Sequence, residues 1–233
     1  MQRTELGPIS TVLTDFDRTL ARLFPWPELE RIVCADLLEY YGDVGVPIEL
    51  FSGETDPYTL WARAYGWMRE YLGPTRSEEL NRRAAARLTA HELEAAGSVR
   101  LLEGVEDALG WLSASAIPVV IVSSNSTRAI ARALQVTGVA GAVAVIWGRA
   151  DHFRMADLKP STVLLDAALA ASGSTPHHAC FVGDSPTDMM AGRSAGMFTI
   201  GVATGTATTQ ELLGVGADLC MDAFPCLRQL RLS

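Results

Sequence analysis

Residues 180–188 read Cys-Phe-Val-Gly-Asp-Ser-Pro-Thr-Asp, and this stretch decides the fold. It opens with a short apolar run without polar alternation, which is typical of a strand buried on both faces of a parallel sheet. Two acidic residues, Asp184 and Asp188, follow the run. Ser185 and Pro186 lie between them and are typical of a helix start, with serine at the N-cap and proline in the first turn. The stretch therefore predicts a buried strand that leads into a helix, with carboxylates at the junction.

The same pattern recurs along the chain. From about residue 101 onward, apolar runs that end in polar residues alternate with segments of helical period, such as 163–171 and 186–195. This alternation predicts an α/β fold with a doubly wound, Rossmann-like parallel sheet and helices on both faces. The other predicted strands cover residues 9–14, 118–122, 142–147 and 198–202.

Residues 21–100 follow a different pattern. Their apolar residues recur at helical spacing, for instance at Leu60, Ala64, Trp67 and Met68, and no strand pattern is visible among them. We therefore expect an all-helical domain inserted after the first strand. The expected division is an α/β core of residues 1–20 and 101–233, with the helical insertion at 21–100.

Composition excludes several classes of function. The 233 residues carry a formal net charge of −8, which disfavours binding to the phosphates of nucleic acid. The longest apolar stretch, residues 139–147, is far too short to span a membrane. The start of the chain does not resemble a signal peptide, and its four cysteines have no spacing typical of a zinc site or disulfide framework. We expect a cytoplasmic protein with a small-molecule partner and leave its oligomeric state open.

Reactive residues follow three of the predicted strands. Asp15 and Asp17 follow the first, Ser123 follows the second, and Asp184 and Asp188 follow the fourth. Ligands of open parallel sheets bind at the carboxyl ends of the strands, so these side chains should converge. Paired carboxylates at such a place favour a hard cation such as Mg²⁺.

The chain has 18 arginines and a single lysine, Lys159. In a chain so biased toward arginine, the position that keeps lysine can be one that needs a compact ammonium group. Chance is the alternative explanation, because one remaining lysine has to lie somewhere.

Four short motifs, in this order, resemble those of the haloacid dehalogenase superfamily of phosphohydrolases, in its phosphoglycolate-phosphatase-like branch. The likeness covers about 20 residues at the start and most of 101–233, whereas residues 21–100 match only by position, as a helical cap. The motifs are Asp15-Phe16-Asp17-Arg18-Thr19-Leu20, Ser123 after Val119-Val120-Ile121-Val122, Lys159-Pro160, and Phe181-Val182-Gly183-Asp184-Ser185-Pro186-Thr187-Asp188.

The resemblance implies a Mg²⁺-dependent phosphatase that acts on a small phosphorylated metabolite through an aspartyl-phosphate intermediate. Asp15 would be the nucleophile, and Asp17 would be the general acid and base. Ser123 and Lys159 would complete the catalytic set. The metal site would comprise Asp15, Asp17, Asp184 and Asp188, and the substrate-binding set would comprise Ser123, Ser124, Asn125, Lys159 and Arg18.

Several alternatives stay open at the level of single residues. Asp188 occupies the third position of a helix that Ser185 would cap, so it could serve a capping box rather than the metal. Ser124 could replace Ser123 as the phosphoryl-binding hydroxyl. Arg18 stands where the family usually has glycine, and it could point to solvent or toward the substrate.

Alternative functions also stay open. A phosphomutase would use the same Asp15 chemistry but return the phosphoryl group to a sugar. A non-catalytic domain that binds a phosphorylated metabolite or a protein would be expected to lack Asp15, Asp17 or Lys159, and all three are present. A dehalogenase would not need Asp17. A small phosphate monoester is the most specific substrate class that the sequence supports.

Overall fold

The computed structural model describes residues 8–230 and contains a six-stranded sheet in which all the paired strands are parallel. The order of the strands across the sheet is β3-β2-β1-β4-β5-β6. The direction of strand succession reverses at β1, between β2 on one side and β4 on the other, which is where doubly wound sheets place their ligands. The strands are β1 (Thr11–Thr14), β2 (Val119–Ser126), β3 (Val145–Arg149), β4 (Ala179–Gly183), β5 (Phe198–Val202) and β6 (Leu219–Met221).

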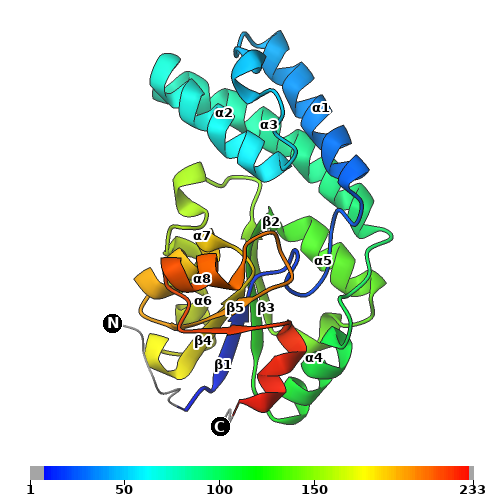
Figure 1. The fold of residues 1–233 in the computed structure, drawn as a ribbon, viewed down its shortest axis with the longest axis vertical. Helices are drawn as coiled ribbons and strands as arrows, with labels where there is room; N and C mark the ends of the chain where they lie inside the picture. The colour runs from blue at the N-terminus through cyan, green and yellow to red at the C-terminus, as the bar shows by residue number, and fades with distance from the viewer. Residues whose placement is uncertain (1–7, 231–233) are drawn as a thin grey trace. The chain divides into compact units, whose positions relative to one another are not determined.

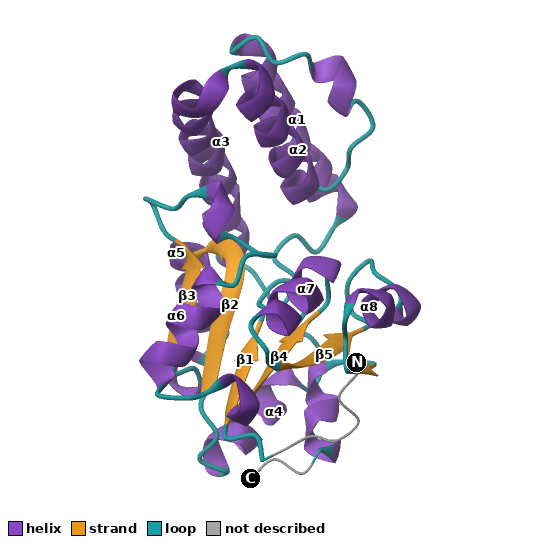
Figure 2. Ribbon diagram, turned by 90° about the vertical axis from the view of Figure 1, so that its left-hand side faces the viewer, coloured by secondary structure: helices purple, strands orange, loops and turns teal. Residues whose placement is uncertain are grey.

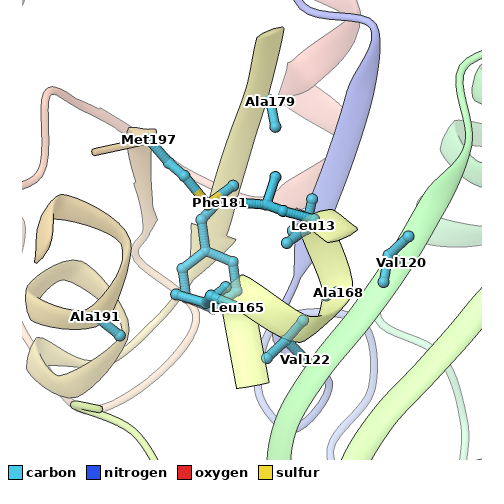
Figure 3. Packing of buried hydrophobic residues seen from close by; sticks show 10 residues of the cluster. Leu13, Val120, Val122, Leu165, Ala168, Ala179, Phe181, Ala191 and Met197 are labelled. Atoms are coloured by element: carbon cyan, nitrogen blue, oxygen red, sulfur yellow. The ribbon is translucent and has the colours of Figure 1, made fainter. Parts of the chain in front are cut away.

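Helices cover both faces of the sheet (Figure 1), with α6, α7 and α8 on one side and α4 and α5 on the other. Leu165 and Ala168 of α6 pack with Phe181 of β4 and Leu13 of β1 in a fully buried apolar cluster (Figure 3). This packing confirms the predicted α/β fold class with a doubly wound parallel sheet. The helices are α4 (Val105–Ala114), α5 (Thr127–Val136), α6 (Val163–Ser172), α7 (Pro186–Ser194) and α8 (Thr209–Val215); the 3₁₀ helices are η2 (Ala140–Ala142), η3 (Met155–Asp157), η4 (Pro176–His178) and η5 (Phe224–Gln229).

The described chain divides into two compact units, with boundaries after Leu23 and after Gly97. We call the unit that contains the sheet the core unit, and residues 24–97 the helical unit. The helical unit contains only helices and connecting loops (Figure 2): α1 (Pro27–Asp43), η1 (Ile48–Phe51), α2 (Pro57–Tyr71) and α3 (Gly73–Ala96). None of the helices within residues 8–230 is long and apolar enough to cross a membrane.

Polar contacts inside the helical unit hold its helices in register. The hydroxyl of Tyr40 in α1 donates to the carbonyl of Leu80 in α3 at 2.9 Å. The indole N–H of Trp61 in α2 donates to Oδ1 of Asn81 in α3 at 2.7 Å, and both side chains are buried. Trp61 therefore packs as part of the interior of this unit, in keeping with the apolar period of the sequence.

The sequence expectations differ from the structure in the extents of several strands and in one strand that was not expected. The third strand was expected at 142–147, but β3 spans Val145–Arg149. The second strand was expected to end before Ser123, but β2 continues to Ser126, with a shift in its register against β3 between Val122 and Ser126. The three-residue edge strand β6 was not predicted, because its partly buried residues lack a distinct apolar run.

Candidate active site

The first motif lies at the carboxyl end of β1, in the centre of the sheet. The backbone N–H of Asp15 donates to the carbonyl of Val182 in β4 at 2.8 Å, which fixes the start of the motif loop between two strands. The side chain of Asp15 is buried, with 6% of the residue exposed. A buried carboxylate needs compensating partners, because its charge is otherwise strongly destabilised.

Lys159 supplies the positive charge at this place. Its ammonium donates to Oδ1 of Asp15 at 2.5 Å and also to Oδ1 of Asp188. Burial alone would lower the pKa of Lys159, but the carboxylates of Asp15 and Asp188 outweigh burial and hold that pKa above its ordinary value. The single lysine of the chain is therefore charged and 95% buried between two carboxylates, with a side-chain exposure of 5%.

Three buried carboxylates lie close together at this end of the sheet. Oxygen atoms of Asp15, Asp184 and Asp188 all lie within 4.8 Å of one another. Burial, together with the neighbouring charges of Asp188, Asp15 and Asp17, raises the pKa of Asp184 to about 8. One ammonium does not neutralise three carboxylates, and a hard divalent cation with oxygen ligands would supply the missing charge.

The loop after β5 limits the space around Asp184. A Cβ atom added to Gly205 would lie only 1.9 Å from Oδ2 of Asp184, so only glycine fits there. The hydroxyl of Thr19 approaches the other oxygen, Oδ1, at 3.4 Å. The hydroxyl of Thr204 donates to the carbonyl of Arg18 and so ties the same loop to the first motif.

Asp188 forms the capping box that the sequence left as one alternative, and its other oxygen contacts Lys159. Its Oδ2 accepts from the backbone N–H of Ser185 at 3.0 Å and from the Ser185 hydroxyl at 2.6 Å, and the Ser185 side chain caps α7 in return. Its Oδ1 accepts from Lys159. One carboxylate oxygen thus serves the capping box while the other faces the site.

Asp17 forms a hydrogen bond outside the three-carboxylate cluster. Its Oδ1 accepts a hydrogen bond from the backbone N–H of Leu23, the last residue of the core unit before the helical unit, at 2.6 Å. Asp17 is still near enough to Asp184 to raise the pKa of that residue.

Arg18 adopts a left-handed backbone conformation, with φ of 58°. Such a conformation is uncommon for residues other than glycine. The backbone N–H of Arg18 donates to the carbonyl of Ala21 at 2.5 Å, and its carbonyl accepts from Thr204. The motif loop therefore keeps the backbone shape typical of glycine although an arginine occupies it.

The polar end of β2 lies beside β1 and β3. The hydroxyl of Ser123 donates to Oδ1 of Asn125 at 2.8 Å, and the backbone N–H of Asn125 donates back to Oγ of Ser123 at 3.2 Å. Burial raises the pKa of Asp15 overall, although Lys159 and, to a smaller extent, a hydrogen bond from Ser123 lower it. Ser123 is thus the serine that faces the carboxylate, while the carbonyl of Ser124 faces Arg149.

Arg149, at the end of β3, was missed in the sequence. It is 3% exposed, and its Nη1 donates to the carbonyl of Ser124 at 2.7 Å. The signal for it was the Gly-Arg pair directly after the apolar run 142–147, at a strand end comparable with those that carry Ser123 and Asp184.

The family comparison agrees with this fold and site. The family model described as haloacid dehalogenase-like hydrolase matches residues 66–202, more than half of the chain. The chain belongs to this family of hydrolases. The match includes Ser123, Lys159, Asp184 and Asp188, whereas Asp15 and Asp17 lie before it.

Two curated proteins are similar to part of this chain. A phosphoglycolate phosphatase of Chromobacterium violaceum is 32% identical over 134 residues, which are 54% of this chain and 54% of that protein. A phosphoglycolate phosphatase of Salmonella paratyphi A is 29% identical over 124 residues, 53% of this chain and 48% of that protein. The chain spans about half the length of the curated relatives it matches.

Solved structures resemble the fold over nearly the whole chain. A predicted phosphoglycolate phosphatase from Haemophilus somnus covers 97% of this chain and 99% of its own, with a TM-score of 0.67 and 19% identity. CbbY from Rhodobacter sphaeroides, solved in complex with phosphate, covers 94% of this chain and 96% of its own, with a TM-score of 0.67 and 22% identity. At this identity the likeness shows the shared fold.

Proposed function

We propose that the protein is a Mg²⁺-dependent phosphatase that hydrolyses a small phosphate monoester through an aspartyl phosphate on Asp15. The observation that carries this proposal is the placement of Asp15. Its buried carboxylate accepts a hydrogen bond from the Lys159 ammonium at 2.5 Å and lies among two further carboxylates at the carboxyl end of the central strand. Membership of a hydrolase family supports the same reaction type.

The reaction would proceed in two displacements at phosphorus. First, a carboxylate oxygen of Asp15 forms a bond to phosphorus while the bond to the ester oxygen breaks, and Asp17 gives its proton to the leaving alkoxide. Then water attacks the aspartyl phosphate, Asp17 takes a proton from that water, and phosphate leaves with Asp15 restored. Oδ1 of Asp17 can keep its hydrogen bond from the backbone N–H of Leu23 while the other carboxyl oxygen carries the proton for the leaving group.

Lys159 and Ser123 would act on the charge of the phosphoryl group. The Lys159 ammonium already lies between two carboxylates, so it can offset the repulsion between Asp15 and an incoming dianion. Ser123 would donate to a phosphoryl oxygen from the end of β2. Ser124, Asn125 and Arg18 complete the proposed substrate-binding set.

The carboxylates fit Mg²⁺, which prefers oxygen ligands. Asp15 and Asp184 would hold the cation together with the backbone carbonyl of Asp17. Asp188 would act indirectly, by orienting Lys159. When bound, the cation supplies positive charge that neutralises the phosphoryl oxygens and the carboxylate cluster.

We propose phosphoglycolate and related small phosphorylated metabolites as the first substrates to test, because the curated relatives are phosphoglycolate phosphatases. The helical unit, residues 24–97, would serve as the cap domain that selects among them, and the core unit would carry the chemistry. An acidic protein of this kind has no expected nucleic-acid partner, and we place it in the cytoplasm.

The test is hydrolysis of an aryl phosphate and of a panel of metabolite phosphates, with Mg²⁺ and with EDTA. Asp15→Asn should lower kcat by more than about 10³-fold, because the amide cannot form the acyl phosphate. Asp151→Asn is the matched control, since Asp151 is exposed on the loop after β3. Phosphate release that needs Mg²⁺ and is lost only in Asp15→Asn supports the proposal. Equal background rates in all three proteins across the whole panel would overturn it.

A further inference from the structure

The buried guanidinium of Arg149 has no part in the reaction as proposed above. An arginine stays protonated at any physiological pH, so a 3% exposed arginine carries a charge that is costly to bury without partners. One of its donors, Nη1, lies 2.7 Å from the carbonyl oxygen of Ser124. Its guanidinium carbon lies 5.9 Å from the ring centroid of Phe153, within the range of a cation–π contact.

The carbonyl that Arg149 holds belongs to the peptide group between Ser124 and Asn125. The other end of that peptide group, the N–H of Asn125, donates to Oγ of Ser123 at 3.2 Å. One peptide plane is therefore fixed at both ends, by a buried cation at its oxygen and by the catalytic serine at its nitrogen. A cation at the oxygen polarises the peptide and strengthens its N–H as a donor.

Ser123 transmits this arrangement toward the nucleophile. Its hydroxyl carries one proton and has two acceptors at hand, Oδ1 of Asn125 at 2.8 Å and the carboxylate of Asp15. A hydroxyl oxygen that accepts a stronger hydrogen bond becomes a better donor itself. The position and polarity of the Ser123 hydroxyl thus depend on the peptide that Arg149 holds.

The backbone of β3 keeps Arg149 close to this loop. Arg149 pairs in register with Ser126, at the place where the pairing of β2 and β3 shifts. A Cβ atom on Gly148 would lie 2.8 Å from the carbonyl oxygen of Asn125 and 2.9 Å from the backbone nitrogen of Thr127, so a side chain there would push the loop away. The Gly-Arg pair at the end of β3 therefore combines close backbone approach with a hydrogen bond to the same loop.

We propose that Arg149 is a positioning residue for the phosphoryl-binding loop, acting through the Ser124–Asn125 peptide to orient Ser123 toward Asp15. The catalytic part of this inference rests on the proposed function; the structural part does not. Arg149 would act without touching the reacting atoms, and its loss would show in the turnover of correctly folded enzyme.

The test compares Arg149→Met and Arg149→Lys with Arg132→Met. Methionine keeps a long apolar stem but removes the donor, lysine restores one charged donor, and Arg132 is an exposed arginine of α5, the helix that follows the same loop. The first readout is exchange of the Asn125 backbone amide, followed by NMR. We expect it to exchange about tenfold faster in Arg149→Met, less so in Arg149→Lys, and unchanged in Arg132→Met.

The second readout is steady-state hydrolysis of the aryl phosphate. We expect kcat to fall about 10- to 100-fold in Arg149→Met, as for loss of a hydrogen bond to a charged group, with a smaller change in KM. Arg149→Lys should recover part of kcat, and it also serves if Arg149→Met does not fold. Unchanged Asn125 exchange and unchanged kcat in a folded Arg149→Met protein would overturn the inference. If the wild type is inactive, the proposed function fails, but amide exchange still decides whether Arg149 holds the loop.

Discussion

A substitution of Gly183, the last residue of β4, tests how tightly the fold fixes the side chain of Asp188. A Cβ atom added to Gly183 would lie 2.5 Å from both Cβ and Cγ of Asp188 and 2.6 Å from its Oδ2. Contacts that short cannot persist, so Gly183→Ala must displace the Asp188 side chain or separate β4 from α7. Displacement would break the capping box with Ser185 and the hydrogen bond from Lys159 together.

The cost can be estimated from these two effects. Inserting a methyl group into a packed site costs about 1–3 kcal/mol. Loss of an N-cap interaction costs about 1 kcal/mol. We therefore expect Gly183→Ala to lower the free energy of unfolding by about 2–4 kcal/mol. Because Lys159 loses one of its two carboxylate partners, kcat should also fall, by about 10- to 100-fold.

Urea unfolding followed by circular dichroism, with hydrolysis of an aryl phosphate, measures both effects. Gly110→Ala is the matched control, since Gly110 lies inside α4 and an added Cβ would meet no heavy atom within 4 Å. Alanine should stabilise that helix by up to about 1 kcal/mol and leave turnover unchanged. If Gly183→Ala were as stable and as active as the control, the tight placement of Asp188 would be refuted.

Three further predictions follow from the site. In EDTA, the free energy of unfolding should fall as pH rises from about 4 to 8, because the raised pKa of Asp184, about 8, makes the folded state bind more protons than the unfolded chain in that window. Urea unfolding at pH 5 and pH 8 should show a loss smaller by a few kcal/mol in Asp184→Asn, and the same pH dependence in both proteins would contradict this. Lys159→Arg should lower kcat by more than about 100-fold, because a guanidinium is too large for a position whose side chain is 5% exposed; steady-state turnover near that of the wild type would refute the requirement for an ammonium. Arg18→Gly should raise the free energy of unfolding by about 0.5–1 kcal/mol, because glycine adopts the left-handed backbone without strain. Urea unfolding measures this beside the control Ala116→Gly, since Ala116 also has a left-handed backbone, with φ of 56°. Destabilisation of Arg18→Gly alone would indicate that the arginine side chain is needed.

Much of the fold could be predicted because strand and helix patterns alternate clearly after residue 101. The apolar run before Asp184 and the capping sequence after it correspond to β4 and α7 at nearly the predicted positions. Parallel strands bring their carboxyl ends to one edge, so Asp15, Ser123 and Asp184 could be predicted to converge without knowledge of side-chain geometry.

Other features depend on geometry that the sequence does not carry. The contact between Arg149 and Ser124 depends on the shifted register of β2 and β3, which no apolar pattern encodes. The turn of Asp17 toward Leu23 depends on the path of the chain after the motif. For Asp188, the sequence posed capping and a site role as alternatives; in the structure one oxygen belongs to the capping box and the other accepts from Lys159.

Because Lys159 is buried, chemical modification of its amine reports how often the carboxylate cluster opens. Every other basic side chain apart from histidine is an arginine, so Lys159 is the only source of an ε-amino group. Reagents that methylate or acylate amines cannot reach it while it is held between Asp15 and Asp188. The rate at which mass spectrometry finds modified Lys159 therefore measures how often the carboxylate cluster opens, with no background from other lysines. A phosphate ester or a divalent cation that closes the cluster should slow that rate, so binding could be followed in the unaltered chain without turnover.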